Sequence, residues 1–279
     1  MDDPQTQNSQ IRRIAIALVS VIVLAAGAWW YWNRQADAAP AAGADAAPAP
    51  AAATPPADPA AAIRHPLEPA PESDAAAPAA SADPDAAARA ALGTLFGEPA
   101  LADWLIPEQL LRRLVATTDN LSRNARIEPL RPVRAPATPF AVQRQVLDQS
   151  AGTERILLGE QNFTRYDAVV ALLAKADMAQ AARLYRQLYP MLQRAYEDLG
   201  YPDRYFNDRV IDTIDHLLAT PEPQAPLLLE QPKVMFRYAD PGLESRSAGQ
   251  KLLLRMGVAH ARTIKQKLQE FRARIAIKE

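Results

Sequence analysis

A run of 19 uncharged residues near the N-terminus, Ile14 to Trp32, is the feature that constrains this chain most. An α-helix rises about 1.5 Å per residue, so a run of this length crosses the roughly 30 Å hydrocarbon core of a bilayer. Two arginines at positions 12 and 13 precede the run, and a cluster of three tryptophans and a tyrosine ends it. Basic residues favour the cytoplasmic side of a membrane and aromatic rings favour its interfaces. The sequence therefore predicts a transmembrane helix over 14–32, with residues 1–13 in the cytoplasm.

This orientation places the rest of the chain in the periplasm, held by a single-pass anchor in a bacterial inner membrane. The alternative is a secretory signal cleaved at Ala36-Asp37-Ala38. Secretory apolar regions run to about 7–15 residues and are followed by a small-residue cleavage site. The run in this chain is longer and carries an aromatic girdle, so we expect the anchor to be retained.

An Ala/Pro-rich segment, residues 33–84, follows the predicted anchor. Between positions 36 and 84, 23 of the 49 residues are alanine and 11 are proline. Proline removes a helical hydrogen bond, and the segment has too few bulky apolar residues to form a core. We expect a disordered spacer that reaches about 40 Å as a coil and about 150 Å when extended. His65 lies in this spacer, where a solvated side chain is expected.

The remaining residues, 85–279, have the composition of a globular domain. They carry 27 Lys and Arg against 23 Asp and Glu, an excess too small and too dispersed for a nucleic-acid interface. The chain has no cysteine, which excludes disulfides, thiolate metal sites and a cysteine nucleophile. It also lacks a Gly-x-Ser-x-Gly motif and a Gly-rich phosphate loop. We expect no cofactor and no metal.

Apolar spacing and capping residues predict a mainly α, bundle-like domain with one minor β-hairpin. Asp83 and Pro84 are typical of a helix start, and Ser247 begins a capping-box pattern. The expected helices are 84–96, 107–121, 162–173, 177–199 with a kink at Pro190, 203–218, 247–256 and 258–275. The hairpin is expected from Phe140–Val146 and Glu154–Leu158, and short extended pieces are expected over 126–139 and 233–238.

Several polar runs in the second half resemble a proteobacterial family of unknown function, domain family 3014. The runs are Asn162-Phe-Thr-Arg-Tyr-Asp167, Leu184-Tyr-Arg-Gln-Leu-Tyr-Pro190, Ala195-Tyr-Glu-Asp-Leu-Gly-Tyr-Pro202, Phe206-Asn-Asp-Arg209, Gln231-Pro-Lys-Val234, Tyr238-Ala-Asp-Pro241 and Ser247-Ala-Gly-Gln-Lys-Leu-Leu-Leu-Arg-Met-Gly257. The resemblance covers about residues 85–275. It implies an N-terminal membrane anchor or signal and no assigned activity. Some family members are called lipoproteins, and this chain departs from that description because it has no cysteine to lipidate.

One predicted helix carries the best candidates for acid–base chemistry. Asp208, Asp212 and Asp215 fall on one face at helical spacing, and paired carboxylates can act as general acid and base. Apolar residues occupy the opposite face, so an ion-paired surface with Arg204 and Arg209 explains the pattern better. We expect His216 to pair with Asp212, and His260 to be a satisfied boundary residue.

Arg and Tyr residues within the family runs are the better candidates for a binding surface, because these types are enriched at interfaces. The competing interpretation is a buried network that fixes helix packing. The candidate residues are Arg165, Tyr166, Asp167, Tyr196, Arg209, Lys251 and Arg255.

The functional hypothesis is a membrane-tethered periplasmic binding or scaffold domain that engages an envelope protein or another envelope component. Two alternatives remain: a periplasmic hydrolase that uses the helix carboxylates, and contact of the basic C-terminal helix with peptidoglycan or anionic lipid. That helix has apolar residues at 261, 264, 268, 271 and 275, a seam expected to pack on the domain's own core. The sequence gives no indication of the oligomeric state.

Overall fold

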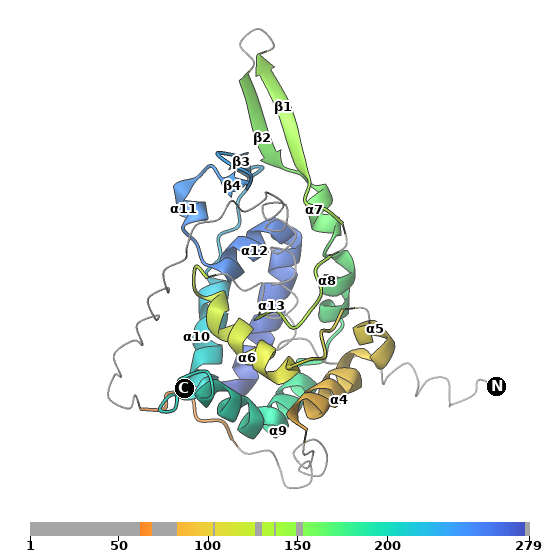
Figure 1. Cartoon of the computed structure of the whole chain (residues 1–279), viewed down its shortest axis with the longest axis vertical. Coiled ribbons are helices and arrows are strands. Elements are labelled where there is room, and N and C mark those ends of the chain that lie inside the picture. Colours follow the sequence, from red (N-terminus) through yellow and green to blue (C-terminus); the bar gives the residue numbers. More distant parts are fainter. Residues whose placement is uncertain are drawn as a thin grey trace, which may run out of the picture.

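The computed structural model describes residues 62–68, 83–102, 104–125, 130–136, 138–148 and 153–276. The predicted cytoplasmic tail, the predicted span over 14–32 and most of the predicted spacer lie outside these ranges. Within them, no helix combines the length and apolar character needed to cross a membrane. The described part is mainly helical with a small antiparallel sheet, as predicted (Figure 1).

Helix α13, Val258–Ile275, is the centre of the helical body (Figure 1). It packs against α8, Asp167–Ala174, α9, Met178–Glu197, α10, Phe206–Leu218, and α12, Ala248–Met256. Its buried residues are Ala261, Ile264, Leu268, Phe271 and Ile275, so the predicted apolar seam faces the chain's own core. Helices α4, Pro84–Phe96, and α6, Leu110–Leu121, complete this core, with the short α5, Glu98–Ala102, beside α4.

Local capping bonds explain why several predicted helix starts are correct. The Asp83 carboxylate accepts from the Asp85 amide, and Asp177 accepts from the amides of Ala179 and Gln180. The Ser247 hydroxyl accepts from the Gln250 amide, as its capping pattern predicts. Helix α9 continues through Pro190 to Glu197.

Three predicted helix boundaries were wrong, and one of them is the start of α6, which lies at Leu110 rather than at Pro107. The helix expected over 162–173 is two pieces, α7, Gln161–Thr164, and α8. Asn162, where the predicted helix starts, does not act as a helix cap. Its side-chain oxygen accepts from the Ala141 amide, and its side-chain nitrogen donates to the carbonyls of Ala141 and Gly159. Helix α10 begins at Phe206 rather than near Asp203. The backbone amide of Phe206 donates to Gln193 Oε1 at this helix start.

The sheet is larger than the predicted hairpin. Strands β1, Val142–Asp148, and β2, Thr153–Leu158, form the expected hairpin, with a bulge between Val146 and Asp148. Strands β3, Leu228–Glu230, and β4, Arg237–Tyr238, extend it in the order β1-β2-β3-β4, all antiparallel. The hairpin projects away from the helical body, and the short α11, Pro241–Glu244, follows β4 (Figure 1).

Helices α6, α10 and α12 approach so closely at Gly249 that a side chain does not fit. A Cβ atom there would lie 2.6 Å from Leu217 Cδ2 and 2.8 Å from the Leu121 carbonyl oxygen. The second contact is with backbone, which cannot move away without shifting α6. Gly249 therefore fixes the distance between these helices.

We expect Gly249→Ala to lower the free energy of unfolding by about 1 kcal/mol or more in chemical denaturation. Overpacking lowers stability by about 1–3 kcal/mol, and the contact with rigid backbone puts this site at the upper end of that range. This loss exceeds the gain of roughly 1 kcal/mol that alanine brings over glycine in helix propensity. Gly242→Ala is the matched control, since Gly242 is exposed and a Cβ atom at that position would meet only the Asp240 side chain. Equal stability of the two variants would contradict the close approach.

Candidate functional site

Four of the seven predicted binding residues are buried together where α7 and α8 meet α12. Arg165, Tyr166, Lys251 and Arg255 are each at most 7% exposed. The Arg165 guanidinium lies 5.9 Å from the centroid of the Tyr166 ring, and Arg255 lies at the same distance from the ring of Tyr238. Such cation–π contacts stabilise buried guanidiniums. This group holds elements together and offers no open surface.

Lys251 and Tyr238 extend the same buried network toward the sheet. The Lys251 ammonium donates to the Glu244 carboxylate at 3.3 Å, to the Glu244 carbonyl at 3.1 Å and to Asn124 Oδ1 at 3.3 Å. The Tyr238 hydroxyl donates to the Lys251 carbonyl at 3.2 Å. Burial raises the pKa of Tyr238 to about 12. These bonds fix α12 against β4 and α11.

Asp167 stands apart from this group because its side chain is 61% exposed. His260 Nε2 lies 3.0 Å from the Asp167 carboxylate and joins α13 to α8. His260 Nδ1 lies 3.0 Å from the Met256 carbonyl. His260 is therefore a partnered boundary residue, as the sequence predicted.

Tyr196 and Arg209 belong to a second buried cluster, centred on Asp119 of α6. Arg209 Nε donates to the Asp119 carboxylate at 2.8 Å, and Arg209 Nη2 donates to the Asp119 carbonyl. Arg123 adds a bond to the same carboxylate at 3.0 Å. Tyr196 stacks on Tyr201 at 4.7 Å, and burial raises the pKa of Tyr196 to about 12. The expected pairing of Arg209 with the α10 carboxylates was wrong, because Arg209 reaches across to α6.

The three α10 carboxylates each bind a group from another part of the chain. Asp208 accepts from the backbone amides of Arg64 at 3.0 Å and His65 at 2.8 Å. Asp212 accepts from the Arg64 guanidinium at 2.6 Å. Asp215 accepts two bonds from Arg272, at 2.6 and 2.9 Å.

His216 does not pair with Asp212 as expected. Its Nε2 lies 2.8 Å from the Ser247 hydroxyl, and it therefore links α10 to the start of α12. Burial lowers the pKa of His216, and the nearby cations Arg209 and Arg246 lower it further. Together with the three occupied carboxylates, this arrangement gives α10 a structural role in joining its neighbours.

Residues 62–68, here called the strap, lie in the predicted spacer yet have a defined position on α10. Besides the bonds to Asp208, the Leu67 amide donates to the Tyr205 hydroxyl at 3.0 Å, and the Leu67 side chain packs against the main core. His65 is partly buried rather than fully solvated. The expectation of a structureless spacer therefore does not hold for these seven residues.

Asn207 connects the strap to the rest of the fold. It is fully buried, and its amide nitrogen donates to the His65 carbonyl at 2.8 Å and the Ile275 carbonyl at 3.0 Å. Its side-chain oxygen accepts from the Tyr185 hydroxyl at 3.1 Å, and its backbone amide donates to the Tyr189 hydroxyl at 3.1 Å. One side chain thus joins the strap, α9 and the end of α13.

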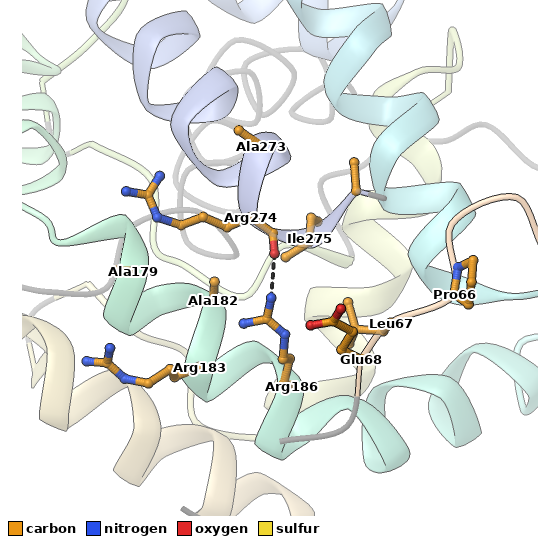
Figure 2. A pocket seen from close by; sticks show the side chains of 11 residues that line it. Pro66, Leu67, Glu68, Ala179, Ala182, Arg183, Arg186, Ala273, Arg274 and Ile275 are labelled. Atoms are coloured by element: carbon orange, nitrogen blue, oxygen red, sulfur yellow. Dashed lines mark hydrogen bonds between the residues drawn. The ribbon is translucent and has the colours of Figure 1, made fainter. Parts of the chain in front are cut away.

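A cavity of about 820 Å³, here called the groove, opens between the strap, α9 and the end of α13 (Figure 2). This volume is within the range of small-molecule sites. The residues that line it are Pro66, Leu67, Glu68, Ala179, Ala182, Arg183, Arg186, Ala273, Arg274, Ile275 and Ala276. None of the seven predicted binding residues is among them.

The groove is an arginine-rich site rather than a metal site. The described residues contain no group of three or more His, Asp or Glu side chains placed to hold a metal ion. The groove arginines were missed by sequence reasoning. Arg183 and Arg274 lie outside the family runs, and Arg186 lies in the run from Leu184 to Pro190 but was not among the candidates chosen from it. The only available signal was the i, i+3 spacing of Arg183 and Arg186, which places both on one face of a helix.

Breaking the Asp119–Arg209 pair tests whether the second cluster is structural. The Asp119 and Arg209 side chains are 5% and 20% exposed. We expect Arg209→Gln to lower the free energy of unfolding by about 2–4 kcal/mol, because it leaves a carboxylate largely buried without its main partner. Adding Asp119→Asn should recover part of that loss. Arg237→Gln is the control, because it breaks a half-exposed ion pair with Glu230, and it should lower the free energy of unfolding by about 1 kcal/mol or less. An equal loss of stability in both arginine variants would contradict a structural role for the Asp119 cluster.

The bonds from Asp208 predict how the strap can be released. An asparagine at 208 keeps the shape but loses the charge and one of the two acceptors, so Asp208→Asn should speed amide hydrogen exchange in residues 62–68 about tenfold. Asp215→Asn is the matched control, with the same change on the same helix but a bond to Arg272 instead of the strap. Unchanged exchange in Asp208→Asn would show that the strap is held otherwise.

Comparisons with known proteins agree with the resemblance seen in the sequence. A family model described as a protein of unknown function, DUF3014, matches residues 110–272, more than half of the chain. No curated protein and no solved structure matches. The match begins at α6, so the strap and α4 lie outside it, and it ends within the last turns of α13. This chain belongs to the DUF3014 family.

Proposed function

We propose that this protein is a membrane-tethered module whose helical domain binds a component of the bacterial envelope on the periplasmic side. The 19-residue uncharged run, the arginines before it and the aromatic cluster after it support the tether and its orientation. The domain acts by binding rather than by catalysis in this proposal.

The docked strap is the observation that carries the proposal. It fixes the chain to α10 at the point where the spacer meets the domain, and it also forms one wall of the groove. The strap therefore holds this part of the tether beside the groove. Twenty-nine residues separate Trp32 from Ala62, and a chain of that length spans at most about 100 Å. The groove is held within that distance of the predicted membrane anchor.

The α10 carboxylates favour binding over hydrolysis. Asp208 and Asp212 are bonded to the strap, and Asp215 is bonded to Arg272. A general base needs a free lone pair within reach of a substrate proton. These oxygens instead accept bonds from the chain itself, which suits a docking role for this helix face.

The cysteine-free sequence allows a direct test of the topology. We expect a membrane-impermeant maleimide to label Gln269→Cys in intact spheroplasts, because Gln269 is exposed on α13. The matched variant Ser9→Cys should be labelled only after the membrane is permeabilised. Both variants should remain with the membrane after an alkaline wash. The reverse labelling pattern, or release of the protein by the wash, would refute the tethered periplasmic module.

A further inference from the structure

The groove is lined by more positive than negative charge. Arg183 and Arg186 come from α9, and Arg274 comes from α13, against the single carboxylate of Glu68. Among the described residues, no ion pair joins any of these three arginines to a carboxylate. In Figure 2 the Arg183 and Arg274 side chains extend along opposite edges, with Ala179 and Ala182 between them. The groove therefore has an excess of guanidinium charge around a small-residue floor.

Arg274 is an exception among the basic residues of α13, because the others form ion pairs with carboxylates. Arg262 and Lys265 pair with Glu222, Lys267 pairs with Glu270, and Arg272 pairs with Asp215. Pairing is thus the rule along this helix. Arg274, the last of these cations in the described part of α13, is the one that lines the groove.

Arg186 is held in a fixed orientation inside the groove. Its Nη2 donates to the Arg274 carbonyl at 2.5 Å (Figure 2). That carbonyl belongs to the last turn of α13, and Asn207 satisfies the next one, at Ile275. The two bonds cover the negative end of the helix, which would otherwise repel an anion. The Arg186 Nε is buried and has no hydrogen-bond partner among the described residues, and the guanidinium makes no ion pair there.

Glu68 shows which chemistry the groove accepts. Its carboxylate points from the strap toward the Arg186 guanidinium in Figure 2, without a hydrogen bond between them among the described contacts. An anionic group of the chain itself thus lies at the mouth of the arginine cluster. An oxyanion with more negative charge than Glu68 that reaches Arg186 would be bound by the planar guanidinium group. The fork of N–H donors in this group matches the geometry of phosphate and carboxylate oxygens.

We propose that the groove binds a phosphate group, with Arg186 as its central ligand and Arg183 and Arg274 at its edges. The three arginines and Glu68 leave a formal excess of two positive charges, which matches a phosphate monoester. The alanine floor and Leu67 accept the organic part to which the phosphate is attached. This names a ligand class for the binding module proposed above, and it rests on that proposed function. The phosphate comes either from a soluble phosphate ester or from a phospholipid headgroup within reach of the tether.

Calorimetric titration of the full chain, in nanodiscs of zwitterionic phosphatidylcholine, tests the site. The probes are inorganic phosphate and glycerol 3-phosphate. We expect saturable binding that Arg186→Gln weakens at least tenfold and that Glu68→Gln strengthens severalfold, since Glu68 is the internal competitor. Arg155→Gln, an equal charge change on the exposed hairpin strand β2, should leave the affinity unchanged.

Unchanged melting temperatures across the variants separate loss of the site from loss of the fold. Absence of saturable binding, or equal weakening by Arg186→Gln and Arg155→Gln, would overturn the phosphate site. The proposed topology would be unaffected by that result, because cysteine labelling tests it independently.

Nanodiscs that contain anionic phosphatidylglycerol distinguish the two sources of phosphate. If headgroups fill the groove, glycerol 3-phosphate should bind more weakly in these discs than in phosphatidylcholine discs, and Arg186→Gln should remove the difference. If the natural ligand is soluble, the affinity should be the same in both discs. Either pattern supports a phosphate site and assigns its source.

Discussion

The buried side chain of Asn207 is the contact on which the arrangement of strap, groove and helical core depends. Its amide group makes three hydrogen bonds, to the strap, to the last turn of α13 and to a tyrosine of α9. A buried amide with unpaired atoms is costly, so these three elements are stable only in positions that satisfy it together. The groove lies between the same elements. Its shape therefore follows from a residue that does not line it.

Other buried polar residues join elements in the same way. Asn162 ties α7 to the start of β1, Asp119 ties α6 to α10, and Lys251 ties α12 to α11. Three of these four residues, including Asn207, fall in runs that carry the family resemblance, and Asp119 binds Arg209 from another such run. The polar character of those runs is explained by packing. Buried networks of this kind specify one arrangement of helices that apolar contacts alone would leave less defined.

Much of the fold could be predicted from the sequence because its signals are local. Asp83, Asp177 and Ser247 bond to amides two or three residues away, and the helices they begin were predicted correctly. The hairpin was also found, since alternation and turn residues are local. The strap, strand β3 and the start of α10 were missed because long-range bonds determine them, such as those between Asp208 and residues 64 and 65.

The candidate site could be predicted less well, for a related reason. An arginine in a polar run looks the same in sequence whether it is buried against a tyrosine, as Arg165 is, or lines a cavity, as Arg186 does. Only the folded position of its neighbours separates the two. The groove joins residues from positions 66 to 276, so its positive charge has no signature in any single segment.

The strap also has a mechanical consequence when the chain that precedes it is pulled. Any pull along the chain from residue 61 reaches the Asp208 bonds and the Asn207 bond before it reaches α4. The bonds of Asp208 and Asn207 to the strap resist this pull together. The first helix of the core is thereby shielded from a pull on the part of the chain that precedes the strap.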